Sequence, residues 1–493
     1  MTTLDALEPA LVWQLFAGLS SFPRPSKHEA RVRDWIIALA HERGFTTAVD
    51  PAGNLRVDVP ASPGFEDAQL LVIQGHLDMV TEANPDSTHD FFNDPITLIV
   101  DREPGGRQIV RADATTLGAD NGIGVSLALA AALDPQTIHG PFELLLTVDE
   151  EMGLTGANAL SPDFFSARRM INLDSEDDGA LYIGCAGGMD TSWRFDLPTS
   201  PLDPDLAMAR VVVGGLRGGH SGGDIHENRG NALKALTRVL RAAPSLRIVS
   251  IDGGSKRNAI PRHANALVAA PPAAIAALTQ AASRVRDAVA AESYEPDADV
   301  HLVTEDLNAD AALSIDDTAR LLAALCAAPS GVTVMHPRVE GLVQTSNNLS
   351  TATTTSAAAD RLSIEIGLLS RSSTTSLLYA LTDQLLALGQ LSGAAVEQYG
   401  EYPGWNPDPD SPLLATCVQV HQALFDKPPR ILAIHAGLEC GVIGDRVGGL
   451  EAISFGPDIR GAHSPSERVY VDSVQRCWTY LRAVLDTLAR APR

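Results

Sequence analysis

The sequence lacks paired cysteines, basic stretches and long apolar runs, and each absence excludes a class of protein. Its 37 Lys and Arg residues are outnumbered by 61 Asp and Glu residues, which gives a formal net charge of −24. Such a chain repels the phosphates of nucleic acids and of anionic lipids, so we expect neither nucleic-acid nor membrane partners. The five cysteines form no CxxC pair, which is typical of reduced thiols and excludes a disulfide-stapled module.

The N-terminal segment carries no Lys or Arg before Arg24, so its apolar stretch from Leu11 to Leu19 lacks the basic flank of a secretory signal. We expect an amphipathic helix there instead. No uninterrupted apolar run reaches the roughly 20 residues that a membrane-spanning helix needs. These features predict a cytoplasmic protein.

Between about Arg31 and Asp178, short β-rich runs alternate with helical patterns. The runs QLLVIQ, FELLLTV and RMINL predict strands, and GIGVSLALAAAL predicts a helix. This alternation is typical of an α/β fold with a mainly parallel mixed sheet. From about Gly188 to Gly400 the pattern changes to Ala-rich helices, alternating runs such as RLSIEIGLL, and the polar segment SNNLSTATTTS, which together predict an inserted α+β domain.

The strand-and-loop pattern returns after Tyr402 and ends in an amphipathic helix from about Asp472 to Leu488. The insertion therefore splits the first domain. We predict a discontinuous domain formed by residues 1–187 and 401–493, and an inserted domain formed by residues 188–400.

Histidine and acidic residues follow the predicted strands at the points where the strands end, and one further acid precedes the predicted helix. In an open α/β sheet, ligands bind beyond the carboxyl ends of the strands, so such residues can converge although they are far apart in the sequence. The segments GHLD, GADNG, VDEE, NLDSE and GAHSP carry His76, Asp78, Asp120, Asp149, Glu150, Glu151, Asp174 and His463.

Five of these residues form a metal-ligand set of two imidazoles and three carboxylates, which suits zinc: His76, Asp120, Glu151, Asp174 and His463. If Asp120 bridges two ions, each ion keeps two further protein ligands. Two ions about 3.5 to 4 Å apart activate water and polarise a carbonyl, which is the chemistry of peptide or amide hydrolysis. We therefore predict two Zn²⁺ ions, with Mn²⁺ or Co²⁺ as substitutes that the same oxygen and nitrogen ligands accept.

Two acids beside this set have predicted supporting roles. Asp78 lies two residues after His76 on one side of an extended chain, where it can accept the second imidazole N–H. Glu150 and Glu151 are adjacent and cannot easily point the same way on an extended chain. One of them can therefore bind metal while the other serves as general base.

Each residue also has a structural interpretation. His76 alone could be a core histidine with ordinary hydrogen-bond partners, Asp120 a helix cap, and Asp174 a turn residue. The acids from Asp149 to Glu151 could be a solvated strand end. The coincidence of four strand-end sites favours the metal interpretation, because polar groups next to buried apolar runs need partners and a metal pair satisfies all of them together.

The sequence resembles the aminoacyl-histidine (Xaa-His, β-alanyl-histidine) dipeptidases, which belong to the aminoacylase and carboxypeptidase group of di-zinc hydrolases. The resemblance is carried by five motifs in the family's order: GHLDMV, LGADNGIG, TVDEEMGLTGA, NLDSED and GAHSPSERV. The resemblance spans nearly the whole chain. It implies a split catalytic domain with an inserted α+β lid domain. It also implies that His76 and Asp174 hold one zinc, that Glu151 and His463 hold the other, and that Asp120 bridges them.

The same resemblance assigns three catalytic roles. Asp78 would orient His76, and Glu150 would be the general base. The segment GLRGGHSGGDIHENRGNAL resembles the lid segment whose histidine stabilises the oxyanion, which indicates His220. The alternative is that His220 is an ordinary loop residue of the lid.

Softer matches concern the substrate. KRNAIP resembles the lid turn that supplies Asn258, LLSRSS offers Arg371 for the terminal carboxylate, and HAGLECG includes Glu439, which would receive the free amino group. Arg371 could instead be a salt-bridge partner and Asn258 a turn residue. For His435, in the HAGLECG segment, a structural role is the alternative.

The resemblance predicts a metallopeptidase, namely a dipeptidase that hydrolyses Xaa-His and other small dipeptides. Alternatives on the same core are an N-acyl amino acid deacylase, an aminotripeptidase or a carboxypeptidase, although an anionic Glu439 at the amine pocket disfavours an acyl group. The non-enzymatic alternative is a metal-stabilised binding protein. Glu150 disfavours it, because Glu150 is an acid that the five metal ligands do not include.

The expected partner is a dipeptide substrate. The large lid of the family is compatible with a homodimer, which no residue of this sequence specifies.

Overall fold

The computed structural model describes residues 4–358 and 360–491, which divide into two compact units. Within the described residues, unit 1 takes up the chain as far as Gly184, the segment Pro407–Ala433 and the residues from Leu438 onward. Unit 2 takes up Cys185–Asn406 and Ile434–Gly437. Unit 2 thus interrupts the sequence of unit 1 with one long and one short segment, and each unit has a hydrophobic core of its own.

Unit 1 is built on a mixed sheet whose strands follow the order β1-β2-β6-β3-β7-β22-β8-β21. The central strands β6, β3, β7 and β22 pair in parallel, whereas β1 with β2, β2 with β6, and β8 with β22 pair antiparallel. The strands are β1 (Thr46–Val49), β2 (Leu55–Val59), β3 (Leu71–His76), β6 (Phe142–Thr147), β7 (Arg169–Asn172), β8 (Ala180–Cys185), β21 (Arg430–Ile434) and β22 (Glu451–Ser454).

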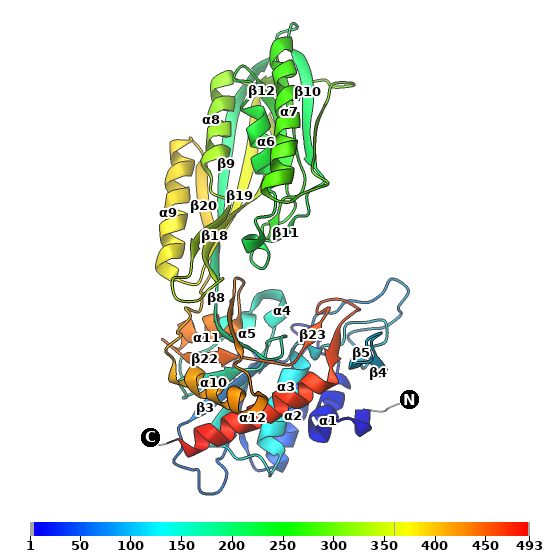
Figure 1. Cartoon of the computed structure of the whole chain (residues 1–493), viewed down its shortest axis with the longest axis vertical. Helices are drawn as coiled ribbons and strands as arrows, with labels where there is room; N and C mark the ends of the chain where they lie inside the picture. The colour runs from blue at the N-terminus through cyan, green and yellow to red at the C-terminus, as the bar shows by residue number, and fades with distance from the viewer. Residues whose placement is uncertain (1–3, 359, 492–493) are drawn as a thin grey trace. The chain divides into compact units, whose positions relative to one another are not determined.

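The apolar runs of the sequence explain this arrangement. Every residue of β3 and β6 is buried, as expected for central strands that have helices on both faces. Helix α3 is apolar on nearly all sides and packs between β3 and α1, while α12 buries only one face and lies alongside α3 (Figure 1). The helices of unit 1 are η1 (Leu4–Ala6), α1 (Ala10–Ser20), α2 (Ala30–Glu42), α3 (Ala119–Leu133), α4 (Glu150–Gly153), α5 (Thr155–Ala159), α10 (Pro412–Phe425), α11 (Glu439–Arg446) and α12 (Val471–Arg490).

A small second sheet completes unit 1. Its antiparallel strands follow the order β23-β24-β5-β4 and join the segment before α3 to the C-terminal part of the chain. The strands are β4 (Leu98–Arg102), β5 (Gln108–Ala112), β23 (Ile459–Arg460) and β24 (Arg468–Tyr470).

Unit 2 is an antiparallel sheet with one layer of helices. Its strands follow the order β15-β10-β14-β12-β18-β19-β9-β16, with β17 paired to β18 and β20 paired to β9. Helix α6 contacts α7 and α8, and α8 contacts α9, so the four helices cover one face of the sheet (Figure 1). The helices are η2 (Ile225–Glu227), α6 (Ala232–Leu240), α7 (Pro272–Glu292), α8 (Ile315–Ala327) and α9 (Thr375–Leu391).

The strands of unit 2 are β9 (Gly187–Pro201), β10 (Ala207–Gly214), β11 (Gly219–His220), β12 (Arg247–Gly253), β13 (Ala259–Ile260), β14 (Ala264–Ala270), β15 (Asp299–Val303), β16 (Ala311–Leu313), β17 (Gly331–Met335), β18 (Val343–Ala358), β19 (Arg361–Ser372) and β20 (Ala395–Tyr402). The polar segment SNNLSTATTTS lies in the long strand β18. Two of its buried amides donate hydrogen bonds to main-chain carbonyls, Asn347 to that of Pro329 and Asn348 to that of Ala259.

The predicted fold class is confirmed: an α/β unit with a mixed sheet, parallel at its centre, is split by an inserted α+β unit. The helices expected from Leu11 to Leu19 and from Asp472 to Leu488 are α1 and α12. None of the helices in the described part of the chain is both long and apolar enough to cross a membrane.

Candidate functional site

The predicted metal ligands of unit 1 converge because of strand register. Gln74 of β3 pairs with Asn172 of β7 in parallel, so His76 and Asp174, each two residues further on, leave the sheet side by side. Asp120 lies in the first turn of α3, Glu151 lies in α4, and His463 lies in the loop between β23 and β24. His463 has φ 61°, a left-handed conformation that is uncommon outside glycine and often marks a functional position.

The two oxygens of the Asp120 carboxylate face different imidazoles. Its Oδ1 lies 3.1 Å from Nε2 of His76, and its Oδ2 lies 3.3 Å from Nε2 of His463. Nε2 of His76 is also 3.3 Å from Oδ1 of Asp174, and Nε2 of His463 is 3.1 Å from Oε2 of Glu151. The five side chains therefore form two groups that share Asp120, which is the division implied by the family motifs.

The donor set fits two divalent cations. Each group offers one imidazole nitrogen and two carboxylate oxygens within 4.8 Å of one another. Oδ1 of Asp174 and Oε1 of Glu151 are buried and make no hydrogen bond with any described residue. Buried carboxylate oxygens of this kind require a positive partner, which a metal ion would supply.

In the metal-free protein, the imidazoles provide the balancing charge. The hydrogen bonds that His463 donates to the carboxylates of Asp120 and Glu151 raise the pKa of His463 to about 11. Burial by itself would lower the pKa of His76, but the neighbouring carboxylates of Asp174 and Asp120 outweigh it and hold that pKa well above its usual range. Burial raises the pKa of Asp174 to about 7, although the charge of His76 opposes this shift. Both imidazoles are thus protonated where metal ions would bind.

Asp78 holds both His76 and the segment that carries Glu150 and Glu151. It is completely buried, and its Oδ1 lies 3.3 Å from Nδ1 of His76. Its carboxylate accepts the main-chain N–H groups of Glu150 at 3.1 Å and Glu151 at 3.2 Å, and the hydroxyl of Ser26 at 2.7 Å. Burial raises the pKa of Asp78, but the hydrogen bond and charge of His76, together with these donors, lower it to about 2. The residue predicted to orient His76 therefore also fixes the start of α4.

Glu150 and Glu151 do not continue the preceding strand, so the predicted extended conformation is wrong. β6 ends at Thr147, Asp149 is left-handed with φ 52°, and the two glutamates begin α4. The two side chains nevertheless converge, because one ligand atom each of Glu150, Glu151 and His76 lie within 4.8 Å of one another. Glu151 also contacts His463, at 3.1 Å from its Nε2. Burial and the nearby carboxylates of Asp174 and Glu439 raise the pKa of Glu150 well above its usual range, against the opposing charge of His76.

A buried polar network beneath the ligands was missed by the sequence analysis. Glu439 is 1% exposed, and its Oε2 accepts the amide of Gln74 and the hydroxyl of Thr147, both at 2.6 Å. Gln74 in turn accepts from the amide of Asn172, whose own oxygen accepts the main-chain N–H of Asp174. The signal in the sequence is an amide residue next to a buried apolar run, Gln74 in LLVIQ and Asn172 in RMINL. Oε1 of Glu439 has no partner among the described residues, and burial raises the pKa of Glu439 to about 7.

In unit 2, the predicted catalytic histidine has a defined tautomer. His220 ends β11, and its Nδ1 accepts the main-chain N–H groups of Gly222 at 3.3 Å and Gly223 at 3.0 Å. Burial and the charge of Arg371 lower the pKa of His220, so its ring is neutral and carries its proton on Nε2. Asn258 precedes the paired strand β13, its carbonyl accepts the N–H of Ser221, and its residue is exposed.

Arg371 is a buried cation of unit 2. It is 5% exposed, forms no ion pair with a described acid, and its Nε has no hydrogen-bond partner. Its Nη1 donates to the hydroxyl of Tyr402. Nearby, Nε2 of His435 lies 2.7 Å from the hydroxyl of Ser346, and burial together with the charge of Arg371 lowers the pKa of His435 to about 3. His435 is therefore neutral and buried.

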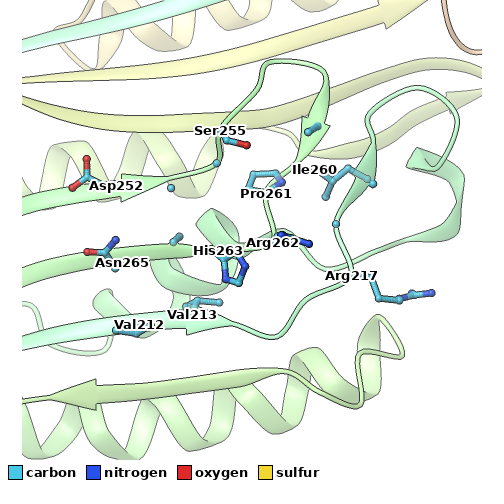
Figure 2. A pocket seen from close by; sticks show the side chains of 16 residues that line it. Val212, Val213, Arg217, Asp252, Ser255, Ile260, Pro261, Arg262, His263 and Asn265 are labelled. Carbon is cyan, nitrogen blue, oxygen red and sulfur yellow. The ribbon is translucent and has the colours of Figure 1, made fainter. Parts of the chain in front are cut away.

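The ribbon of β11 and β13 also borders a hollow of about 810 Å³ in unit 2 (Figure 2). Its lining includes Gly219 and Ala259, the chain neighbours of His220 and Asn258, as well as Arg217, Arg262 and His263. The described metal-ligand groups all belong to unit 1 and none to this hollow.

Comparison with known proteins gives the family. Residues 72–487 match the model of peptidase family M20/M25/M40. The cytosol non-specific dipeptidase of Escherichia coli strain K12 is 38% identical over 489 residues, which cover 98% of this chain and 99% of that protein. The aminoacylhistidine dipeptidase of Vibrio alginolyticus has a TM-score of 0.90 at 38% identity, covering 99% of this chain and 98% of that one. A tripeptidase of Staphylococcus aureus, with a TM-score of 0.59 at 14% identity over 98% of this chain and all of the other, shares the fold.

The chain belongs to peptidase family M20/M25/M40 and is a peptidase. The resemblance noted from its motifs is confirmed by the match over nearly the whole length of both relatives.

We expect metal binding to displace protons. A ligating imidazole must be neutral, whereas His463, with its pKa of about 11, carries a proton in the metal-free protein at neutral pH. The affinity for Zn²⁺ should therefore rise as the pH rises from about 6 to 8, and binding should release protons. Isothermal titration calorimetry in two buffers of different ionisation enthalpy measures the number released. His463→Ala should release fewer, and equal binding enthalpies in the two buffers would contradict the prediction.

Proposed function

We propose that this peptidase is a dipeptidase that uses two divalent metal ions, Zn²⁺ by preference, to hydrolyse Xaa-His and other small dipeptides. The observation that carries the proposal is the Asp120 carboxylate, whose two oxygens face His76 and His463 separately. Glu150 adds an acid that the two ligand groups sharing Asp120 do not use. The names of the two relatives at 38% identity support dipeptides as the substrate class.

Two ions bound by these residues would lower the pKa of a water molecule and polarise the scissile carbonyl. Glu150 is proposed to take the proton from that water and to deliver it to the leaving amine, a role for which a raised pKa is suitable. Asp78 fixes the main chain at Glu150 and Glu151, so base and metal ligand keep a constant separation. This arrangement favours an enzyme over a metal-stabilised binding protein.

The two ends of a dipeptide call for charged partners. Oε1 of Glu439 is a buried acceptor without a partner among the described residues, and we propose that it receives the free amino group. Arg371 is a buried guanidinium whose Nε has no hydrogen-bond partner among the described residues, and we propose that it binds the terminal carboxylate through its planar donor fork. Asn258, whose residue is exposed, is proposed as a further substrate contact. His435 is assigned a structural role, because its Nε2 is already bonded to Ser346.

His220 is proposed to donate a hydrogen bond to the oxygen on which negative charge develops. Its Nδ1 is occupied by two glycine N–H groups, so the proton on Nε2 remains for the substrate. A neutral imidazole with a fixed tautomer is a good donor for this purpose because it needs no rearrangement during the reaction.

Two further expectations remain proposals. The name of the Escherichia coli relative supports a cytoplasmic location. The homodimer stays a prediction that sedimentation of the purified protein would test.

Activity and its chemical requirements test the function directly. Purified protein should hydrolyse Xaa-His and other dipeptides, lose activity to a chelator and regain it with two equivalents of Zn²⁺. Amidated and N-acetylated dipeptides should be poor substrates, because each lacks the charge that Arg371 or Glu439 would bind. Faster hydrolysis of acetylated amino acids or tripeptides would favour the alternative activities, and full activity in metal-free protein would exclude the di-metal mechanism.

The adjacent glutamates should separate catalysis from metal binding. Glu150→Gln should retain both ions yet lose about 10² to 10⁴ in kcat, the usual contribution of a positioned general base. Glu151→Gln should lose metal as well, because Glu151 contacts His463 in the second ligand group. Metal content and kcat are measured on the same samples. The opposite pattern would exchange the two assignments.

His220→Ala should lower kcat and kcat/KM together by about 10² to 10³ without changing the metal content, because the interaction exists only in the transition state. His226, an exposed histidine of the neighbouring η2, provides the matched control, and His226→Ala should keep kcat within a few fold of the parent. A near-normal kcat for His220→Ala with two bound ions would remove His220 from the mechanism.

A further inference from the structure

The start of α3 is capped by a carboxylate from a distant part of the chain. Glu467 is 2% exposed, and its two oxygens accept four consecutive main-chain N–H groups. Oε2 accepts from Leu117 at 2.7 Å and Gly118 at 2.9 Å, while Oε1 accepts from Ala119 at 2.7 Å and Asp120 at 3.2 Å. The donors lie at the start of α3 and in the residue before its N-cap Gly118, a region where the N–H groups of a helix have no partner within the helix itself.

Because Glu467 caps the helix, Asp120 does not have to accept the local N–H groups at the start of α3. An Asp in the first turn of a helix ordinarily satisfies local N–H groups. Here Gly118 precedes the helix and no side chain of α3 itself caps it. Because Glu467 already accepts these donors, both oxygens of Asp120 remain available to face His76 and His463.

Arg24 acts on the other side of the same segment. It is 2% exposed and donates to the carbonyls of Leu77 at 2.9 Å, Asp78 at 2.8 Å and Gly118. A side chain at position 118 would meet the guanidinium, because a Cβ added there lies 2.5 Å from Nη2 of Arg24. Two buried charges of opposite sign thus bind main-chain groups, and they tie the segments of His76, Asp120 and His463 together.

We propose that Glu467 is a positioning residue of the metal centre. His463 lies four residues before Glu467, so the hydrogen bonds of Glu467 fix the backbone of Asp120 relative to the loop that carries His463. In this way Glu467 sets the geometry of Asp120, the ligand that the two groups share. The inference deepens the proposed function and rests on it. No step of the reaction needs contact between Glu467 and the substrate.

The expected consequence is weaker metal binding. In Glu467→Gln, the amide NH₂ would face main-chain donors, so the segment from Leu117 to Asp120 would have to move. Losing a group that orients a ligand typically weakens metal affinity by about 10- to 100-fold. Because Asp120 faces both imidazoles, both ions should be affected.

Glu143 supplies a matched control in the same unit. It is 5% exposed, and its carboxylate accepts the main-chain N–H groups of Ser166 and Ala167, each at 2.9 Å. Glu143→Gln therefore removes the charge of the same kind of buried carboxylate at a position away from the ligand groups. Without metal, the Glu143→Gln variant should have a lower melting temperature than the parent. Its affinity for Zn²⁺ should stay within about threefold of that of the parent.

The experiment measures Zn²⁺ affinity by competition with a chromophoric chelator, and the melting temperature of the metal-free proteins, for the parent, Glu467→Gln, Glu467→Asp and Glu143→Gln. Glu467→Gln should bind Zn²⁺ at least tenfold more weakly than both the parent and Glu143→Gln, with Glu467→Asp between them. Parent-like affinity in Glu467→Gln, or an equal loss in Glu143→Gln, would overturn the proposal. If Glu467→Gln does not fold, the comparison of Glu467→Asp with Glu143→Gln decides.

The same titration separates this proposal from the proposed function. A parent protein that binds one ion contradicts the di-metal mechanism, but Glu467→Gln must still weaken that ion, because Asp120 belongs to both ligand groups. A parent protein that binds no ion overturns both proposals.

Discussion

The concentration of acidic side chains at the carboxyl edge of the unit 1 sheet is the constraint on which the rest of the structure depends. Asp120, Glu150, Glu151 and Asp174 lie around two imidazoles. Buried like charges raise one another's pKa unless cations or hydrogen-bond donors balance them. The surrounding architecture supplies this balance: main-chain N–H groups are directed at Asp78, an amide and a hydroxyl are directed at Glu439, and protonated imidazoles stand where metal ions would bind.

Arg371 is a buried cation of unit 2, whereas the ligand groups of unit 1 are rich in acids. Burial and the charge of Arg371 lower the pKa of His220 and of His435, whereas neighbouring carboxylates raise the pKa of His76 and of His463 in unit 1. The same residue type therefore has different chemistry in the two units. An acid-rich group suits cations, whereas a buried guanidinium suits anions such as a carboxylate.

The sequence predicts most of the fold and the ligand set, because both follow from local patterns. Apolar runs that end in His76, Asp149 or Asp174 identify strands and the edge where ligands gather. The residues that position the ligands cannot be predicted from local patterns, because their contacts are with residues far away in the sequence. Glu467 acts through main-chain groups about 350 positions away, and only register and chain tracing reveal that contact. Glu150 and Glu151 were expected on an extended chain, but the left-handed Asp149 starts a helix there.

The order of the ligands along the chain has a consequence for synthesis. His76, Asp120, Glu151 and Asp174 all precede unit 2, whereas His463 and the capping Glu467 follow it near the C-terminal end. The ribosome therefore synthesises four of the five predicted ligands first and then all of unit 2. Only afterwards does it synthesise His463, the second imidazole that faces Asp120, and Glu467, the carboxylate that caps α3. Until that last segment is synthesised, the nascent chain carries one complete ligand group and one incomplete one. The second ligand group is consequently completed only after unit 2 has been synthesised, and a chain truncated before His463 lacks a predicted ligand of that group however well the preceding segment folds.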